Sequence, residues 1–160
     1  MRKDQPIEAK KNFARVESWT VYGAIGPCFD KPVFMLAKST NMDDVDQFLR
    51  SLLAHRSNQY SKQPIHVVID NNPAHVNAYK RLKDYTGLNL VYQPSESPEF
   101  NCQETVWRMV KHSYRKKMFR RDQDLKDGND HRTFILEVLE EVKAKIDMSK
   151  VLNANERYIQ

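Results

Sequence analysis

A length of 160 residues suffices for one domain with a hydrophobic core. The apolar content of 40% and the mean hydropathy of −0.74 indicate a very polar surface. No segment approaches the roughly 18 apolar residues of a membrane span, and the N-terminus lacks the apolar region of a signal peptide, so we expect an intracellular protein with no membrane partner. The net charge of +5 favours an anionic partner, while Cys28 and Cys102, which form no C-x-x-C motif, indicate reduced structural thiols and not a zinc site.

The first part of the chain predicts a hairpin and then a helix. Residues 18–26 and 31–39 are rich in β-formers and flank a Gly-Pro turn, so we expect two paired strands. Thr40 or Asn41 then suits the N-cap of a helix. After the N-cap, apolar residues recur at i, i+3, i+4 and i+7 spacing, as in a helix with one apolar face. They are Met42, Val45, Phe48, Leu49, Leu52 and Leu53.

The second part predicts two strands that alternate with helices. Residues 65–70 predict a third strand, in which Val67, Val68 and Ile69 lead directly to Asp70, and we expect this strand to be buried on both faces. Pro73 suits the first position of a helix, which Gly87 ends, and residues 88–94 predict a fourth strand. Further helices are expected at 102–120, 134–146 and 149–158.

This order of elements predicts an α/β fold, in which a mixed sheet is flanked by helices. Residues 1–17 are polar and charged and predict a leader, which leaves 18–160 as the domain. Ligands of such sheets collect at the carboxyl ends of parallel strands. Asp70 is expected at such an end, where an acid is held rigidly beside the crevice.

Two carboxylates, Asp70 and Glu104, are candidate metal ligands. Mg²⁺ prefers oxygen ligands, and two such ions can hold the attacking and leaving oxygens of a phosphoryl transfer. Both acids also have structural explanations. Asp70 could form an Asx turn with the asparagines that follow it. Glu104 could complete a capping box with Asn101, and His75 alone is typical of a surface or capping histidine.

Two stretches together resemble the DDE-type transposases of the mariner and insertion-sequence superfamily. "VVIDNNPAH" matches the family's strand that ends in Asp before Asn-x-x-x-His. "YQPSESPEFNCQETVWRMVK" matches its "PPYSPELNPIE-x-W" block, with Glu104 in place of the last acid and Trp107 in place of the tryptophan. The 33 residues between Asp70 and Glu104 are close to the family's usual interval, and the resemblance covers about residues 18–120.

The resemblance implies an RNase H-like fold and the cleavage and joining of DNA strands. It implies that Asp70 and Glu104 hold Mg²⁺ or Mn²⁺ in a two-metal site. Four further residues occupy matching positions and are expected to support that site: Asn71, His75, Asn101 and Trp107. For Trp107 we favour packing beneath the site over stacking on a base.

One departure from the family pattern bears on activity. The family's first catalytic Asp lies on a strand upstream of "SWTVYGAIG", and no apolar run precedes Asp4, Glu8 or Glu17 here. We therefore expect a domain that lacks the first strand, with greatly reduced or no strand transfer, unless another chain supplies the acid. The alternative is a catalytically inactive remnant that binds nucleic acid or dimerises. A nuclease for RNA–DNA hybrids is a third option, which the "SPEFN" block disfavours.

A basic segment follows Glu104 and predicts contacts with DNA phosphates. Residues 108–121 contain seven Lys and Arg and no acid, and they are Arg108, Lys111, Arg115, Lys116, Lys117, Arg120 and Arg121. Such contacts give salt-dependent affinity without reading the sequence. A solvated helix face is the structural alternative. The expected partners are DNA and a second copy of the chain, with no small-molecule substrate, and the expected location is the nucleus in a eukaryote or otherwise the cytoplasm.

Overall fold

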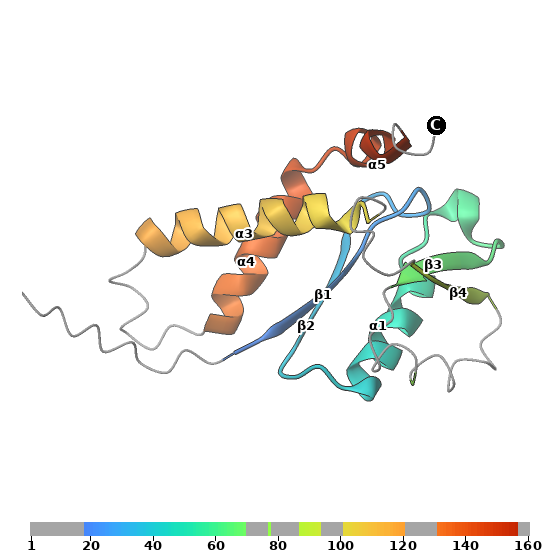
Figure 1. Ribbon diagram of the computed structural model, residues 1–160, viewed down its shortest axis with the longest axis horizontal. Coiled ribbons are helices and arrows are strands. Elements are labelled where there is room, and N and C mark those ends of the chain that lie inside the picture. Colours follow the sequence, from blue (N-terminus) through green and yellow to red (C-terminus); the bar gives the residue numbers. More distant parts are fainter. Residues whose placement is uncertain (1–17, 70–76, 78–86, 94–100, 121–130, 157–160) are drawn as a thin grey trace, which may run out of the picture.

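The computed structural model describes residues 18–69, 77, 87–93, 101–120 and 131–156. Within these ranges the chain forms four strands, four α-helices and one short 3₁₀ helix (Figure 1). The predicted α/β class is confirmed, and the arrangement is consistent with an RNase H-like fold. The predicted helix after Pro73 lies outside the described residues. None of the helices in the described part is long and apolar enough to cross a membrane.

The predicted hairpin is confirmed, with shorter strands than the sequence suggested. Strand β1 (Thr20–Ala24) pairs antiparallel with β2 (Val33–Ala37), so that Tyr22 lies opposite Met35. A turn begins at Gly26, whose carbonyl accepts a hydrogen bond from the Phe29 N–H at 3.1 Å. The hairpin thus provides one half of the sheet layer.

Helix α1 (Met42–Ala54) begins as its sequence predicts. The Asn41 side chain accepts a hydrogen bond from the Asp44 N–H at 2.8 Å, which identifies Asn41 and not Thr40 as the N-cap. Asp43 and Asp44 lie in the first turn, where the helix dipole favours negative charge. The apolar positions at helical spacing face the core, since the buried residues are Val45, Phe48, Leu49 and Leu52.

The second pair of strands is parallel. After the short 3₁₀ helix η1 (Asn58–Tyr60), β3 (Ile65–Ile69) pairs with β4 (Leu88–Tyr92). Gly87 precedes β4 with a φ of +103°, a left-handed conformation that suits the glycine expected to end a helix.

The prediction that the third strand is buried on both faces is wrong. Burial alternates along β3 and along β4, and Val68 and Val91 are 61% and 46% exposed. Among the described residues, α1 packs against the face that carries Ile65 and Leu88. A run of apolar residues therefore did not distinguish a strand covered on one face from one covered on two.

The described strands form two separate two-stranded sheets, where one mixed sheet was expected. Both sheets contribute to a single hydrophobic cluster with α1, which includes Tyr22 and Val33 from the hairpin and Ile65 and Leu88 from the parallel pair. One helix thus covers the same side of both sheets.

Three helices cover the other side of the hairpin (Figure 1). They are α3 (Gln103–Arg120), α4 (His131–Lys145) and α5 (Met148–Glu156). Val106 of α3 is fully buried in a second cluster with Val142, Ile146 and Val151, and Ile25 and Phe34 of the hairpin region pack against this cluster. Helix α3 is therefore held between the hairpin and the two C-terminal helices.

Candidate metal and nucleic-acid site

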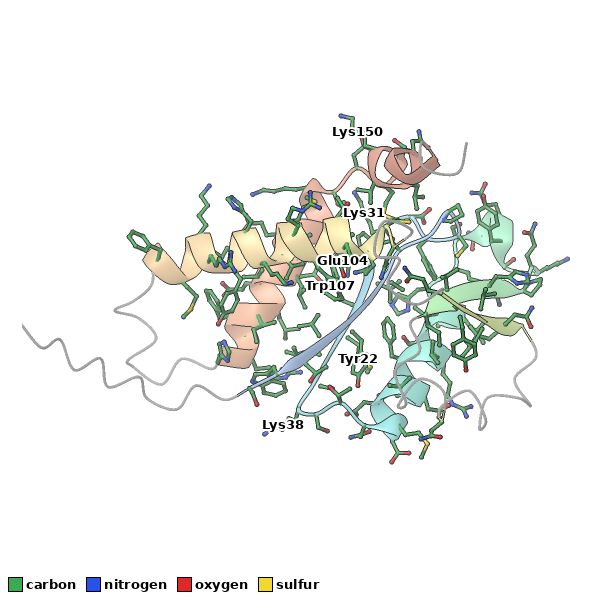
Figure 2. All side chains as sticks on the ribbon, in the orientation of Figure 1. Tyr22, Lys31, Lys38, Glu104, Trp107 and Lys150 are labelled. Atoms are coloured by element: carbon green, nitrogen blue, oxygen red, sulfur yellow. The ribbon has the colours of Figure 1, made fainter. Side chains whose placement is uncertain are left out.

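Glu104 lies in the first turn of α3, close to the end of β1, and its side chain is exposed (Figure 2). Its carboxylate makes no hydrogen bond or ion pair with any described residue. An exposed carboxylate without a protein partner is a suitable oxygen donor for Mg²⁺ or Mn²⁺, so this side chain fits the proposed metal.

Asn101 caps this helix. Its side-chain oxygen accepts a hydrogen bond from the Gln103 N–H at 3.0 Å, and its carbonyl accepts one from the Glu104 N–H, also at 3.0 Å. A capping box would also require the Glu104 carboxylate to accept a hydrogen bond from the Asn101 N–H. That bond is absent from the described residues, so the cap leaves the Glu104 carboxylate available to a ligand.

The residues on either side of Glu104 fix the start of α3 against the hairpin. The Trp107 ring packs against Phe34, with ring centroids 6.1 Å apart. A Cβ placed on Gly23 would come within 2.7 Å of both Trp107 Cη2 and Gln103 Nε2, so β1 and α3 are in very close contact there. The Trp107 ring therefore packs against the hairpin at the start of α3.

The basic residues of α3 present an exposed cationic surface. Arg108, Lys111, Arg115 and Lys116 are exposed, and none forms an ion pair with a described residue. Lys117 differs, because its ammonium pairs with Glu141 of α4 at 3.0 Å. The first four cations remain available for phosphates, whereas Lys117 is already neutralised in part.

A groove of about 450 Å³ runs between α3 and α4 beside this surface. Its lining includes His112 and the charged residues Arg108, Lys116, Lys145 and Glu141. Glu141 accepts hydrogen bonds from Lys145 and Lys117, which lower the pKa of its carboxyl group to about 2. The groove therefore keeps a net positive charge at neutral pH.

Several of the predicted site residues lie outside the described residues. These are Asp70, Asn71, His75 and Arg121, and for Arg120 only the backbone is described. Within the described residues, no three His, Cys, Asp or Glu side chains gather where they could hold a metal ion. Asp70 follows Ile69, the last residue of β3, so the sequence still assigns it to the end of that strand.

Sequence reasoning missed four residues that the structure brings to the site region. Gln103 and Gly23 make the close contact beneath Glu104, and His112 and Lys145 line the groove. His112 lies within residues 108–121, but the prediction for that segment named only its Lys and Arg residues. Lys145 lies on another helix, so only the packing of α4 on α3 reveals its place.

Comparison with known families identifies the family of this chain. The family model described as DDE superfamily endonuclease matches residues 1–126, which include Asp70, Glu104 and the basic residues that follow. No curated protein and no solved structure matches the chain. Since the match covers well over half of the sequence, the chain belongs to the DDE superfamily endonuclease family of transposase-type nucleases.

Proposed function

We propose that the chain is a transposase-derived DNA endonuclease and strand-transfer domain of the mariner and insertion-sequence type, with the globular domain over residues 18–160. Its family is generally dependent on divalent metal and implies DNA as the substrate. The observation that carries the proposal is the exposed Glu104 carboxylate, which has no partner among the described residues and lies at the start of a strongly basic helix.

In this proposal Asp70 and Glu104 would hold Mg²⁺ or Mn²⁺. The bound ion would supply positive charge at the phosphate that is cut. Asn101 and Trp107 act by position: the first caps the helix and the second fixes its start against β2. Asn71 and His75 are proposed to support the other ligand. Arg108, Lys111, Arg115 and Lys116 would bind the DNA backbone on either side of the cut.

The test of catalysis is the nicking of supercoiled plasmid by the pure chain with Mg²⁺ or Mn²⁺. We expect Glu104→Gln and Asp70→Asn each to abolish metal-dependent nicking. Glu140→Gln is the matched control, because Glu140 is an exposed acid on α4 that pairs only with Lys143 of the same helix among the pairs described. Nicking that survives in both site variants would overturn the proposed metal ligands.

The test of DNA binding is the dependence of affinity on salt. Each phosphate contact releases about one counterion, so Arg115→Ala or Lys116→Ala should reduce the slope of log K against log salt concentration by about 1. Lys143→Ala is the control, since Lys143 pairs with Glu140 on α4. Equal slopes in all variants would mean that α3 does not contact the DNA.

A catalytically inactive remnant that grips DNA, or that dimerises, is the second candidate. The observation that favours it is that Arg108, Lys111, Arg115 and Lys116 are exposed and form no ion pair with a described residue, so they could bind DNA without any metal ligand. Salt-sensitive binding without metal-dependent nicking would support this candidate. Nicking that is lost in Asp70→Asn would support the active enzyme, and nuclear location in a eukaryotic cell is expected for either.

A further inference from the structure

The exposed side chains of α3 form one continuous row along the helix. Over residues 103–119, seven side chains are exposed and all the others are buried or half-buried. The seven recur at i, i+4, i+7, i+8, i+11, i+12 and i+15, which places them on one face of an α-helix. We call this face the exposed stripe. It begins at Glu104, ends at Phe119 and carries five basic residues between them: Arg108, Lys111, His112, Arg115 and Lys116.

Phe119 is the unusual member of the exposed stripe. Its side chain is 90% exposed, more than any other large apolar side chain in the described part of the chain. Its ring makes no contact with the ring of a described residue. Water therefore surrounds the ring on its helix, and a ligand that covers the ring gains the hydrophobic contribution of its burial.

The charge of the exposed stripe indicates the chemistry of that ligand. Glu104 is the only acid of the stripe, and its Lys and Arg side chains form no ion pair with a described residue. Such a row of cations fits the phosphates of a nucleic-acid strand. The faces of an aromatic ring carry partial negative charge, so Phe119 does not suit a phosphate. Every base, however, offers a face on which an aromatic ring can stack.

We propose that Phe119 stacks on an unpaired base of the DNA strand that the cations of the exposed stripe bind. This proposal rests on the proposed function, because it takes DNA as the ligand of α3. The helix is continuous from Gln103 to Arg120 (Figure 1), so at 1.5 Å per residue Phe119 lies about 22 Å along the axis from Glu104. A strand with the base spacing of B-DNA that follows α3 reaches Phe119 about six or seven nucleotides from the phosphate beside Glu104.

This contact selects the form of the DNA and not its sequence. In a paired duplex the faces of the bases are covered by their neighbours, so an aromatic ring reaches one only where the strand is single or the base has left the duplex. Stacking also tolerates any base, because each has such a face. The domain is therefore expected to prefer DNA with an unpaired strand beside the cut over a fully paired duplex.

The test is the affinity of the full chain for a single-stranded oligonucleotide and for a blunt duplex, measured by fluorescence anisotropy without divalent metal. We expect Phe119→Ala to weaken single-strand binding by about tenfold, as the loss of one stacked base does. The slope of log K against log salt concentration should not change, because no phosphate contact is lost. Phe119→Trp should keep the affinity. Val91→Ala, which removes an exposed apolar side chain from β4, is the matched control and should have no effect.

Three results would overturn the stacking contact. The first is equal single-strand affinity of Phe119→Ala and the unmodified chain. The second is an equal loss of affinity for the duplex, because Phe119 would then act as a wedge between paired bases. The third is weaker self-association of Phe119→Ala in sedimentation with unchanged DNA affinity, which would assign the ring to a contact between two copies. Because binding is measured without metal, a failure of nicking refutes the proposed catalysis alone, whereas an unmodified chain that binds no DNA refutes both proposals.

Discussion

Gly23 is the residue at which the hairpin and the helix that carries Glu104 approach most closely. Its missing side chain leaves room for the Trp107 ring and the Gln103 amide, which flank Glu104 in the sequence. The Trp107 ring is rigid and already packs against Phe34. A side chain at position 23 would therefore displace the start of α3, and the position of the Glu104 carboxylate with it.

Replacement of this glycine tests the contact. We expect Gly23→Ala to lower the free energy of unfolding by about 1–3 kcal/mol, as overpacking of a tight contact does. Gly26→Ala is the matched control, since a Cβ there meets its nearest atoms at 3.7 Å, an ordinary contact distance. It should change stability by less than about 0.5 kcal/mol. Urea unfolding of both variants checks this, and equal effects would contradict the packing at Gly23.

At the scale of elements, α3 and α4 are joined by apolar packing and by polar contacts along their length. Near one end, the Tyr114 hydroxyl and His131 Nε2 lie 2.9 Å apart, and the Tyr114 ring packs edge-on against Phe134. Burial raises the pKa of the Tyr114 hydroxyl. Lys117, about one turn further along α3, pairs with Glu141 of α4. Of these residues, Glu141 also lines the groove between the two helices.

The Glu141 pair gives this connection a pH dependence. Its folded-state pKa is about 2, below the ordinary value of 4.5, so the pair stabilises the fold above about pH 4.5 and this contribution is lost as pH falls toward 2. We expect Glu141→Gln to lower the melting temperature at pH 7 and to make little difference near pH 2. Glu140→Gln breaks only a pair within α4 and is the control. Thermal unfolding from pH 2 to 7 measures both, and a constant difference would contradict the assignment.

The elements were largely predictable from the sequence, because local chemistry determines them. The N-cap at Asn41, the helical spacing in α1 and the β-formers of the hairpin each depend on neighbours within a few residues. The α4 helix begins earlier than predicted, at His131, since the contact of that residue with Tyr114 comes from a distant part of the chain. The sequence predicted one mixed sheet and missed its division into two for the same reason. The spacing of apolar residues along a strand does not indicate which other strand it pairs with.

The candidate site was only partly predictable. Glu104, Asn101 and the cations of α3 follow a motif that is read along one segment, and the structure describes them together at one helix. The close approach of Gly23 to Gln103 depends on two elements about 80 residues apart, which no local pattern encodes. Asp70 lies outside the described residues, so its role as a metal ligand stays a prediction.

At the scale of the whole molecule, α1 is the element that both sheets share. Leu52 is 1% exposed and belongs to the cluster that contains residues of β1, β2, β3 and β4. The two sheets are not paired with each other within the described chain. The arrangement of the two sheets therefore depends on α1. A substitution on the buried face of α1 should destabilise both sheets.

Truncation of this leucine tests that dependence. We expect Leu52→Ala to cost about 2–5 kcal/mol of stability, because a buried leucine leaves a cavity. Amide hydrogen exchange should accelerate in both β1–β2 and β3–β4. Leu53→Ala, one residue along and only partly buried, should have a smaller effect. Faster exchange confined to one sheet would show that the sheets are stabilised separately.

The burial of Val106 has a consequence for where this domain can be cut. The family similarity ends at residue 126, yet Val142, Ile146 and Val151, which cover Val106, all lie beyond that point. A fragment trimmed to the family limits would expose this valine and its neighbours to water, at a cost of about 1.5–3 kcal/mol for a side chain of this size. The family match and the packing of Val106 therefore place the end of the domain at different residues. The position of Glu104 on α3 depends on the packing, which extends beyond residue 126.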